Sequence, residues 1–401
     1  MPASTVSTVS ANAIGTPIVS ARVTSLDIVR GVAMILMAID HVRVYSGVPA
    51  GGPTFGIFFT RWITNFVAPA FVFLAGTSAW LYGRKFSQRS ALSGFLVTRG
   101  VWLIFLELTF LRVAWAFNFD FQHYLLAGVI WMIGWSMIAL AGTIYLPTPS
   151  IATIGIALVA LHNLTNLFRP QLAHAFGPDG PNWLLRILYF GGAVEIGKSG
   201  PPLLILYVLV PWMGLMFSGY ALGPITQKPS DVRRRIYLQL GSALTVLYVA
   251  LRLVGVYGDP HPWDRHTLFS FLNTAKYPAS LEYLCMTIGP MFLLWAIAER
   301  WTGRIARVVE TFGRVPMFYY LLHIPLIHFA ACVVSLVREG HVDSWLFTNH
   351  PVDPGPLPPE YMWSLPLLYL VYGVCLVILY FPCRWYARLK ATRRSRILSY
   401  I

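Results

Sequence analysis

Several ionisable residues lie within one hydrophobic segment near the start of the chain. The stretch SLDIVRGVAMILMAIDHVR, residues 25–43, contains Asp27, Arg30, Asp40 and His41. On a helix, Asp27 and Arg30 can pair at a spacing of three residues, and His41 shares a face with Arg30 about 16 Å further along the axis. Arg30 could therefore bind an anionic group near one end of the segment, with His41 acting as a general base deeper within it.

Simpler roles exist for the same residues. Arg30 could be an anchor that extends its charge to a membrane surface, and His41 could make a hydrogen bond between helices. Because ionisable groups inside a hydrophobic span are costly, finding them together on one helix favours a functional site. Asp40 shares a turn with His41, about 100° around the helix, and we assign it to the predicted catalytic group.

A later segment, GRVPMFYYLLHIP at residues 313–325, repeats the order of arginine and then histidine. Arg314 precedes His323 by about 13 Å of helical rise, with Tyr319 between them. This segment could line the same cavity as the first helix. Alternatively, its prolines kink the helix, and His323 caps the backbone carbonyls that they leave free.

The composition identifies the class of protein that must position these residues. Hydrophobic residues make up 56% of the 401 residues and charged residues only 11%, with a mean hydropathy of +0.61. Soluble domains usually carry about 25% charged residues, so we predict a membrane protein. The four cysteines form no CxxC pair, which indicates neither a disulfide framework nor a metal site.

Several segments are long and apolar enough to cross a bilayer, which takes about 20 residues each. Such spans must be helical, because lipid offers no partner to a free backbone group. We therefore predict an all-α, polytopic transmembrane bundle of about ten helices. The predicted spans are 27–46, 61–83, 93–113, 123–144, 150–164 (short), 201–223, 236–256, 278–298, 310–336 and 362–383.

The distribution of charge predicts how the bundle is oriented. The net charge is +14, and Lys and Arg gather in alternate loops, most strongly in 224–235 and 384–401. Cytoplasmic loops are enriched in these residues, so both ends of the chain are predicted to be cytoplasmic, and no nucleic acid partner is needed. The predicted organisation is a disordered leader at 1–21, a transmembrane domain at 22–390 and a basic tail at 391–401.

The pattern LD-x-x-RG, followed by a histidine eleven residues after the arginine, resembles the first helix of membrane acyltransferases that O-acetylate cell-envelope sugars. Most of residues 22–390 resembles a bacterial membrane family related to heparan-alpha-glucosaminide N-acetyltransferase. The blocks that carry this resemblance are RVTSLDIVRGVAMILMAIDHVR (22–43), WITNFVAPAFVFLAGTSAWLYGRK (62–85), TRGVWLIFLELTFLR (98–112), VIWMIGWSMIALAG (129–142), VPWMGLMFSGYALG (210–223), TAKYPASLEYLCMTIGP (274–290) and GRVPMFYYLLHIPLIH (313–328).

This resemblance implies acyl transfer across the inner, cytoplasmic membrane, with cytosolic acetyl-CoA or another acyl-CoA as donor. The acceptor would be an amine or hydroxyl of an extracytoplasmic sugar or similar molecule, and no metal is expected. His41 would be the base or the acyl carrier, and Arg30 would orient it or bind the donor. The implied partners are membrane lipid, the acyl-CoA and the acceptor; a homodimer stays open beside a monomer.

The chain departs from the lysosomal enzyme in one respect. That enzyme resembles this chain but uses a histidine in the lumenal stretch after its first helix, whereas residues 42–61 contain no histidine. Either His41 takes this role, as in the sugar O-acetylases, or the chemistry differs.

Basic residues at the inner ends of the second and third spans could hold the phosphates of CoA through charge-assisted hydrogen bonds. For Arg84, Lys85 and Arg89, plain anchoring at the cytoplasmic face is the favoured alternative, because it is the commoner role of such residues. Arg99 lies inside the third span and resembles an arginine that the O-acetylases keep there, which favours donor binding. Arg314 completes the predicted donor set.

Other polar residues are predicted to support the site or to receive the acceptor. Glu107 is expected to pair with Arg30, Arg99 or His41, or to stay protonated. The other predicted supporting residues are Asp27, Asn65, His323 and Tyr319. The predicted acceptor entrance comprises Lys276, Tyr277, Ser280 and Glu282, together with Asp120 and His123.

A proton-coupled transporter for a small solute or a lipid-linked precursor is the competing function. Asp40, Glu107 and His323 would then form a proton relay inside the membrane. No internal repeat is visible in the sequence, which counts mildly against a transporter built from inverted halves.

Overall fold

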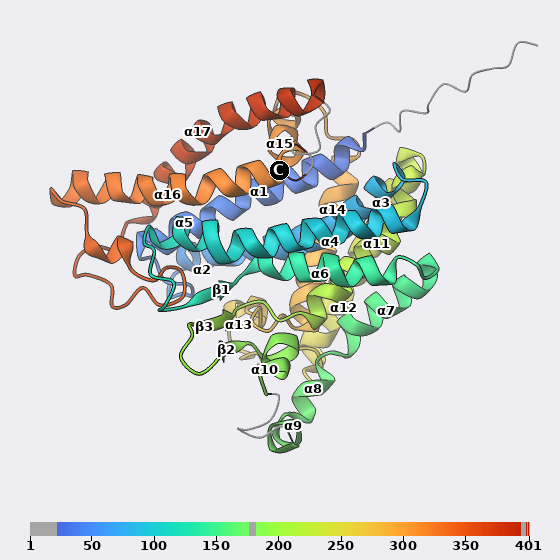
Figure 1. The fold of residues 1–401 in the computed structure, drawn as a ribbon, viewed down its shortest axis with the longest axis horizontal. Coiled ribbons are helices and arrows are strands. Elements are labelled where there is room, and N and C mark those ends of the chain that lie inside the picture. The colour runs from blue at the N-terminus through green and yellow to red at the C-terminus, as the bar shows by residue number, and fades with distance from the viewer. Residues whose placement is uncertain (1–21, 176–181, 394–397, 399, 401) are drawn as a thin grey trace, which may run out of the picture.

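Long helices run beside one another along one axis of the molecule (Figure 1). The structure is a computed structural model that describes residues 22–175, 182–393, 398 and 400. The predicted leader at 1–21 and part of the predicted tail lie outside the described residues. The predicted class, a polytopic helical bundle, is confirmed.

The first half of the described chain is almost entirely helical. Its elements are α1 (Thr24–Ser46), α2 (Phe55–Trp62), η1 (Ile63–Phe66), α3 (Val67–Gly83), α4 (Arg89–Leu106), the π-helical turn η2 (Glu107–Leu111), α5 (Arg112–Ala116), β1 (Leu125–Ala127), α6 (Val129–Thr143), α7 (Thr148–Leu161), α8 (Leu164–Leu167), α9 (Arg169–Ala175), α10 (Asn182–Leu185), η3 (Arg186–Phe190), β2 (Gly192–Glu195) and β3 (Pro202–Ile205).

The second half contains the longest helices. Its elements are α11 (Val210–Leu222), η4 (Gly223–Gln227), α12 (Ser230–Val254), α13 (Leu268–Leu272), α14 (Leu281–Ala298), α15 (Arg304–Arg314), α16 (Pro316–Glu339), η5 (Ser344–Phe347) and α17 (Leu365–Thr392).

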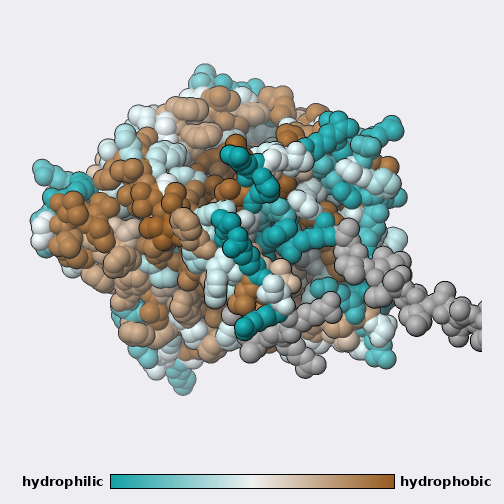
Figure 2. All heavy atoms as spheres, turned by 90° about the horizontal axis from the view of Figure 1, so that it is seen from above, coloured by the Kyte–Doolittle hydropathy of each residue, from teal (hydrophilic) through white to brown (hydrophobic). Residues whose placement is uncertain are grey.

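Within the described residues, seven helical runs are long and apolar enough to cross a membrane. They are Phe55–Gly83, Arg89–Ala116, Thr148–Leu167, Ser230–Val254, Leu281–Ala298, Pro316–Glu339 and Leu365–Thr392. Figure 2 shows a broad hydrophobic area on one face, with hydrophilic side chains gathered toward one end, as expected of a surface in contact with lipid. The total of ten spans and the cytoplasmic placement of both ends remain predictions.

Two predicted spans begin with extended backbone instead of helix. In a small sheet, β3 pairs in parallel with β1 and antiparallel with β2. The predicted span at 201–223 therefore becomes helical only at Val210. Residues 202–205 are extended because they form β3, and α11 begins at Val210 with a proline in its first turn, where the missing N–H costs nothing.

The predicted ninth span, 310–336, is two helices. α15 ends at Arg314 and α16 begins at Pro316. The residue before a proline is pushed out of the helical conformation, and Val315 accordingly lies outside the helical region, with φ −131° and ψ 51°. Arg314 and His323 therefore lie on different helices, and the helical-rise estimate of their separation does not apply.

α1 and α15 cross with their backbones in contact, which only glycine permits. A Cβ atom at Gly31 would lie 2.0 Å from the carbonyl oxygen of Val309, and one at Gly313 would lie 1.8 Å from the carbonyl oxygen of Asp27. Small residues allow this kind of approach between helices in membranes. The crossing also brings the Gly313 carbonyl oxygen to 3.0 Å from the Arg30 guanidinium.

We expect Gly313→Ala to lower the free energy of unfolding by roughly 1–3 kcal/mol, because the added methyl group must push the two helices apart. The measurement is thermal unfolding of the detergent-solubilised protein. Gly373→Ala in α17 is the matched control, since a Cβ there meets no atom within 4 Å. Equal melting temperatures for the two variants would contradict the close crossing.

Candidate active site

Two histidines from distant parts of the chain meet at the centre of the candidate site. Nδ1 of His41 on α1 lies 2.7 Å from Nε2 of His323 on α16. The planes of the two rings are nearly parallel, with an interplanar angle of 24° and centroids 4.7 Å apart. His323 is fully buried, and Trp115 packs its ring edgewise against His41. The second arginine–histidine segment therefore does contribute to the same site as the first helix.

A small chamber of about 40 Å³ adjoins His41. Its polar lining comes from Asp40, Thr64, Tyr207, Lys276 and Tyr320 as well as His41; its apolar lining comes from Met37, Val67, Ala68, Phe71 and Val129. Asp40 is held by Arg43 at 3.0 Å and lies 3.9 Å from Arg61. The chamber is therefore near both a histidine ring and a carboxylate that is fixed by cations.

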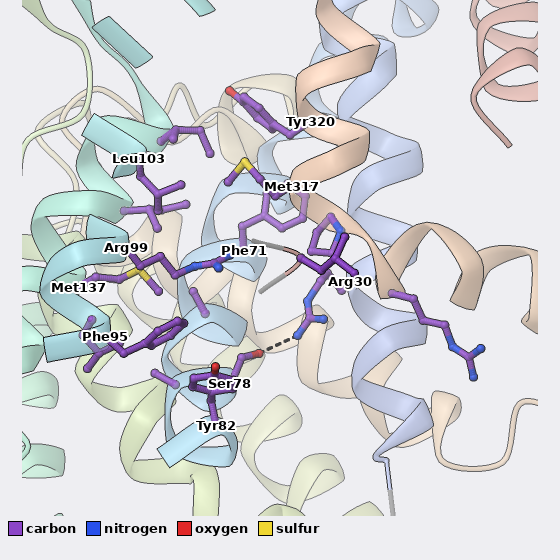
Figure 3. A pocket seen from close by; sticks show the side chains of 18 of the residues that line it. Arg30, Phe71, Ser78, Tyr82, Phe95, Arg99, Leu103, Met137, Met317 and Tyr320 are labelled. Carbon is purple, nitrogen blue, oxygen red and sulfur yellow. Dashed lines mark hydrogen bonds between the residues drawn. The ribbon is translucent and has the colours of Figure 1, made fainter. Parts of the chain in front are cut away.

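A much larger cavity of about 690 Å³ lies between helices of the bundle (Figure 3), and Arg22, Lys85 and Lys390, from segments predicted to be cytoplasmic, are among its lining residues. Pockets for small molecules and cofactors usually measure about 300–1,000 Å³. Its basic lining residues are Arg22, Arg30, Lys85, Arg99, Arg314, Lys390 and Arg393. Its deeper lining is largely apolar and includes Leu103, Ile130, Ile133, Met137 and Met317. An elongated ligand with a polyanionic end and an apolar arm would match this polarity.

The two cavities meet at shared residues. Phe71, Val129 and Tyr320 line both the large cavity and the chamber. A molecule that fills the large cavity to its apolar end would thus bring that end against the wall of the chamber that holds His41.

Arg30 is fixed within the large cavity by three hydrogen bonds. Its guanidinium donates to Asp27 at 3.2 Å, to Ser78 at 2.7 Å and to the Gly313 carbonyl at 3.0 Å. Asp27 also pairs with Arg22. In Figure 3, Arg30 and Arg99 approach the cavity from opposite sides, from α1 and α4. Arg30 therefore presents a rigid positive charge to the cavity instead of extending into solvent as a free anchor.

A family profile described as "Heparan-alpha-glucosaminide N-acetyltransferase, catalytic" matches residues 22–253, which is more than half of the chain. The chain belongs to this family. The predicted relationship is thereby confirmed, and membership supports a membrane protein of the acetyltransferase type. The match covers α1 and most of both cavities, but ends before α16 and His323. A search of the curated proteins found no match.

The predicted donor residues of this family member separate into two groups. Lys85, Arg99 and Arg314 line the large cavity. Arg84 bonds to Gln227, and Arg89 donates to the Tyr145 carbonyl at 2.6 Å; neither is among the lining residues. Their places fit the anchoring role that the sequence also allowed.

Glu107 has a different partner from those the sequence suggested. Its Oε2 accepts hydrogen bonds from the backbone N–H groups of Ile130 at 2.8 Å and Trp131 at 3.2 Å. These groups begin α6, where a helix has N–H donors without internal partners and a positive dipole end. The predicted pairing of Glu107 with Arg30, Arg99 or His41 is therefore wrong, because its carboxyl group caps the N-terminus of α6.

The other supporting residues lie close to the chamber. Asn65 accepts a hydrogen bond from Arg61 at 2.9 Å. Tyr319 stacks on the His323 ring with centroids 5.1 Å apart, and its backbone carbonyl lies 3.1 Å from Nδ1 of His323.

Only part of the predicted acceptor entrance reaches the described chamber. Lys276 lines it, and the neighbouring Tyr277 is 42% exposed. Ser280 and Glu282 instead tie the start of α14 to its surroundings: Ser280 bonds to Asp259 at 2.7 Å, and Glu282 pairs with Arg252 at 3.0 Å.

The other two predicted entrance residues belong to an outer contact. His123 lies 3.6 Å from Asp353, and the backbone N–H of His123 donates to Asp120. Neither residue is among those lining the chamber.

Several residues of the site are not among those predicted from the sequence. Arg61 stands at the edge of a predicted span, and the rule that ionisable residues in spans are functional candidates could have found it. Phe71, Val129 and Tyr207 carry no such signal, because an aromatic or aliphatic residue in a hydrophobic helix is most often ordinary packing.

We expect Glu107→Leu to lower the free energy of unfolding by about 1–3 kcal/mol, because the α6 N–H groups lose a buried acceptor. Glu107→Gln keeps one acceptor oxygen and should be milder. Thermal unfolding measures both, with Glu195→Gln at an exposed strand position as control. If Glu107→Gln kept full stability but abolished activity, Glu107 would be a proton carrier and not a helix cap.

Proposed function

We propose that this protein transfers an acyl group, acetyl in the first instance, from a cytoplasmic acyl-CoA to an amine or hydroxyl of an extracytoplasmic sugar-like acceptor. The observation that carries the proposal is the junction of the two cavities beside His41. Membership in a family named for N-acetyl transfer supports the type of reaction. The cell membrane of a bacterium is the proposed location.

The large cavity suits CoA as the donor. Its basic mouth would bind the phosphates through charge-assisted hydrogen bonds, at which arginine is especially effective. The apolar depth between α3, α4, α6 and α16 would hold the pantetheine arm. The thioester would then lie near Phe71, Val129 and Tyr320, at the wall of the chamber.

The chamber would bring acceptor and thioester together. His41 would take the proton from the acceptor as its nitrogen or oxygen attacks the thioester carbonyl. The new C–N or C–O bond forms as the C–S bond breaks, and the departing CoA thiolate receives the proton from His41. General base catalysis by a positioned histidine contributes typically about 10²–10⁴-fold to such a rate.

The acceptor would approach from the side of Lys276 and Tyr277. Tyr207 and Tyr277 share a hydrogen bond at 3.2 Å, and Thr64 adds a hydroxyl to the chamber wall. Hydroxyl, ammonium and carboxylate groups in one chamber suit the reacting hydroxyl or amine of an acceptor such as a sugar. At about 40 Å³ the chamber would hold only that reacting group and the acetyl group, with the rest of the acceptor outside.

The decisive experiment compares His41→Ala with the wild type in liposomes supplied with radiolabelled acetyl-CoA and amino sugars. We expect the variant to lose about 10²-fold or more in transfer rate and to keep its affinity for acetyl-CoA. His261→Ala is the matched control, because that side chain is 77% exposed. Undiminished transfer by His41→Ala would overturn the assignment; uptake driven by a pH gradient without any need for CoA would support a transporter instead.

The size of the chamber makes a separate prediction about the donor. A volume of about 40 Å³ suits an acetyl group, and Phe71 is the bulkiest apolar side chain at the junction. We expect Phe71→Ala to raise the preference for butyryl-CoA over acetyl-CoA by about tenfold or more, since one methylene is worth 10- to 200-fold in a fitted pocket.

The measurement for Phe71→Ala is the ratio of kcat/KM values for the two donors, which is insensitive to the amount of folded enzyme. Phe95→Ala is its control, because Phe95 lines the large cavity but not the chamber. An unchanged ratio in Phe71→Ala would exclude this residue as a determinant of acyl length.

A further inference from the structure

The hydrogen bonds of His323 determine where its proton resides. Nδ1 of His323 lies 2.7 Å from the carbonyl oxygen of Tyr320 and 3.1 Å from that of Tyr319. Carbonyl oxygens only accept hydrogen bonds, so Nδ1 must carry the hydrogen. In a neutral imidazole the other nitrogen is then an acceptor, which leaves Nε2 of His323 with a lone pair.

The two carbonyl groups that His323 contacts are not the one that the nearby proline leaves without a partner. Pro325 lacks an N–H, so the helix carbonyl that it leaves free is that of Leu321, four residues earlier. His323 bonds instead to Tyr319 and Tyr320, in the manner of a side chain that bonds back to its own helix. His323 therefore does not cap the carbonyl that Pro325 leaves free. Its Nε2 atom makes no bond to the helix and can serve as the acceptor for His41.

The state of His323 fixes the state of His41. Two ring nitrogens 2.7 Å apart need one hydrogen between them. Because Nε2 of His323 has none, Nδ1 of His41 must supply it. A neutral His41 is therefore protonated on Nδ1, and its Nε2 carries the lone pair.

We propose that His323 is a positioning residue that holds His41 in the Nδ1–H tautomer, so that Nε2 of His41 is the atom that takes the proton from the acceptor. His41 lines the chamber whereas His323 does not, so Nε2 is the nitrogen left available there. A chain of hydrogen bonds thus runs from the Tyr320 carbonyl through His323 to His41. It orients this base as a carboxylate orients the histidine of a hydrolase triad, but the group at its far end is a neutral carbonyl.

The neutral end has a chemical consequence. When Nε2 of His41 gains a proton, its Nδ1–H bond to His323 becomes charge-assisted and stronger. The proton on Nδ1 stays between the two rings, while the one on Nε2 passes on to the CoA thiolate. One proton enters and one leaves in each turnover, and the dyad returns to its starting state.

The tautomer can be measured without any activity. Solid-state NMR of protein in liposomes with ¹⁵N,¹³C-labelled histidine distinguishes protonated from bare ring nitrogens and assigns each to the δ or ε position. The protein has ten histidines, so the signals of this pair are identified by their loss in His41→Ala and His323→Phe. We expect Nδ1 to be protonated and Nε2 bare in both residues; a His41 protonated on Nε2 would overturn the proposal.

A pair of substitutions tests the catalytic consequence, which rests on the proposed acyl transfer. His323→Phe keeps a ring but removes the acceptor, and should lower kcat by roughly 10–100-fold, as is typical when a group that orients a histidine is lost. Affinity for acetyl-CoA should not change. His323→Gln offers an amide oxygen to the His41 N–H and should recover most of the kcat.

The results of these experiments distinguish a failure of the His41–His323 proposal from a failure of the proposed acyl transfer. Normal kcat in a folded His323→Phe protein would remove the positioning role. A wild type with the expected tautomer but no acyl transfer would remove the proposed function and leave the proton arrangement standing. Equal damage in His323→Phe and His323→Gln, with weakened acetyl-CoA binding, would mean that His323 only supports the fold and would overturn the proposal.

Discussion

An ionised side chain inside a hydrophobic helix bundle must be paired, because taking it out of water costs several kcal/mol. α1 carries such groups at both ends. Asp27 is paired with Arg22 and Arg30 at one end, and Asp40 lies between Arg43 and Arg61 at the other. His41 meets the constraint differently, through a hydrogen bond that needs no charge. α1 itself supplies two of these cations, Arg30 and Arg43, whereas Arg61 comes from α2 and His323 from α16.

The same constraint explains why the close helix crossing matters to the site. Arg30 has one carboxylate partner and needs further acceptors, which the Gly313 carbonyl and Ser78 provide. The carbonyl can reach Arg30 only because two glycines let α1 and α15 approach backbone to backbone. The close crossing of α1 and α15 thus determines where the Arg30 charge lies in the large cavity. The polarity of the cavity therefore depends on how these helices pack.

The sequence indicated the bundle and the polar pattern of α1 because both are local: hydrophobic runs, loop charges and a spacing of eleven residues. It also indicated that the segment with His323 could join the same cavity. The sequence could not reveal that Glu107 caps α6. The residues around Glu107 contain no signal of which other helix will end beside it in the fold. Pro316 predicted a kink within one helix, whereas the structure has two separate helices that meet at Val315. Phe71 and Val129 became part of the site only because α3 and α6 each bring one of them to the walls of both cavities.

The residues shared by the two cavities have an electrical consequence. A continuous column of water through the bundle would let ions and protons run down the membrane potential, which is worth about 2.3 kcal/mol per charge for each 100 mV. The large cavity and the chamber share walls at Phe71, Val129 and Tyr320, so this is where such a column would have to pass. In the proposed reaction a thioester and an acceptor group meet within bonding distance at the same place, and the bound substrates would therefore displace the water that could conduct.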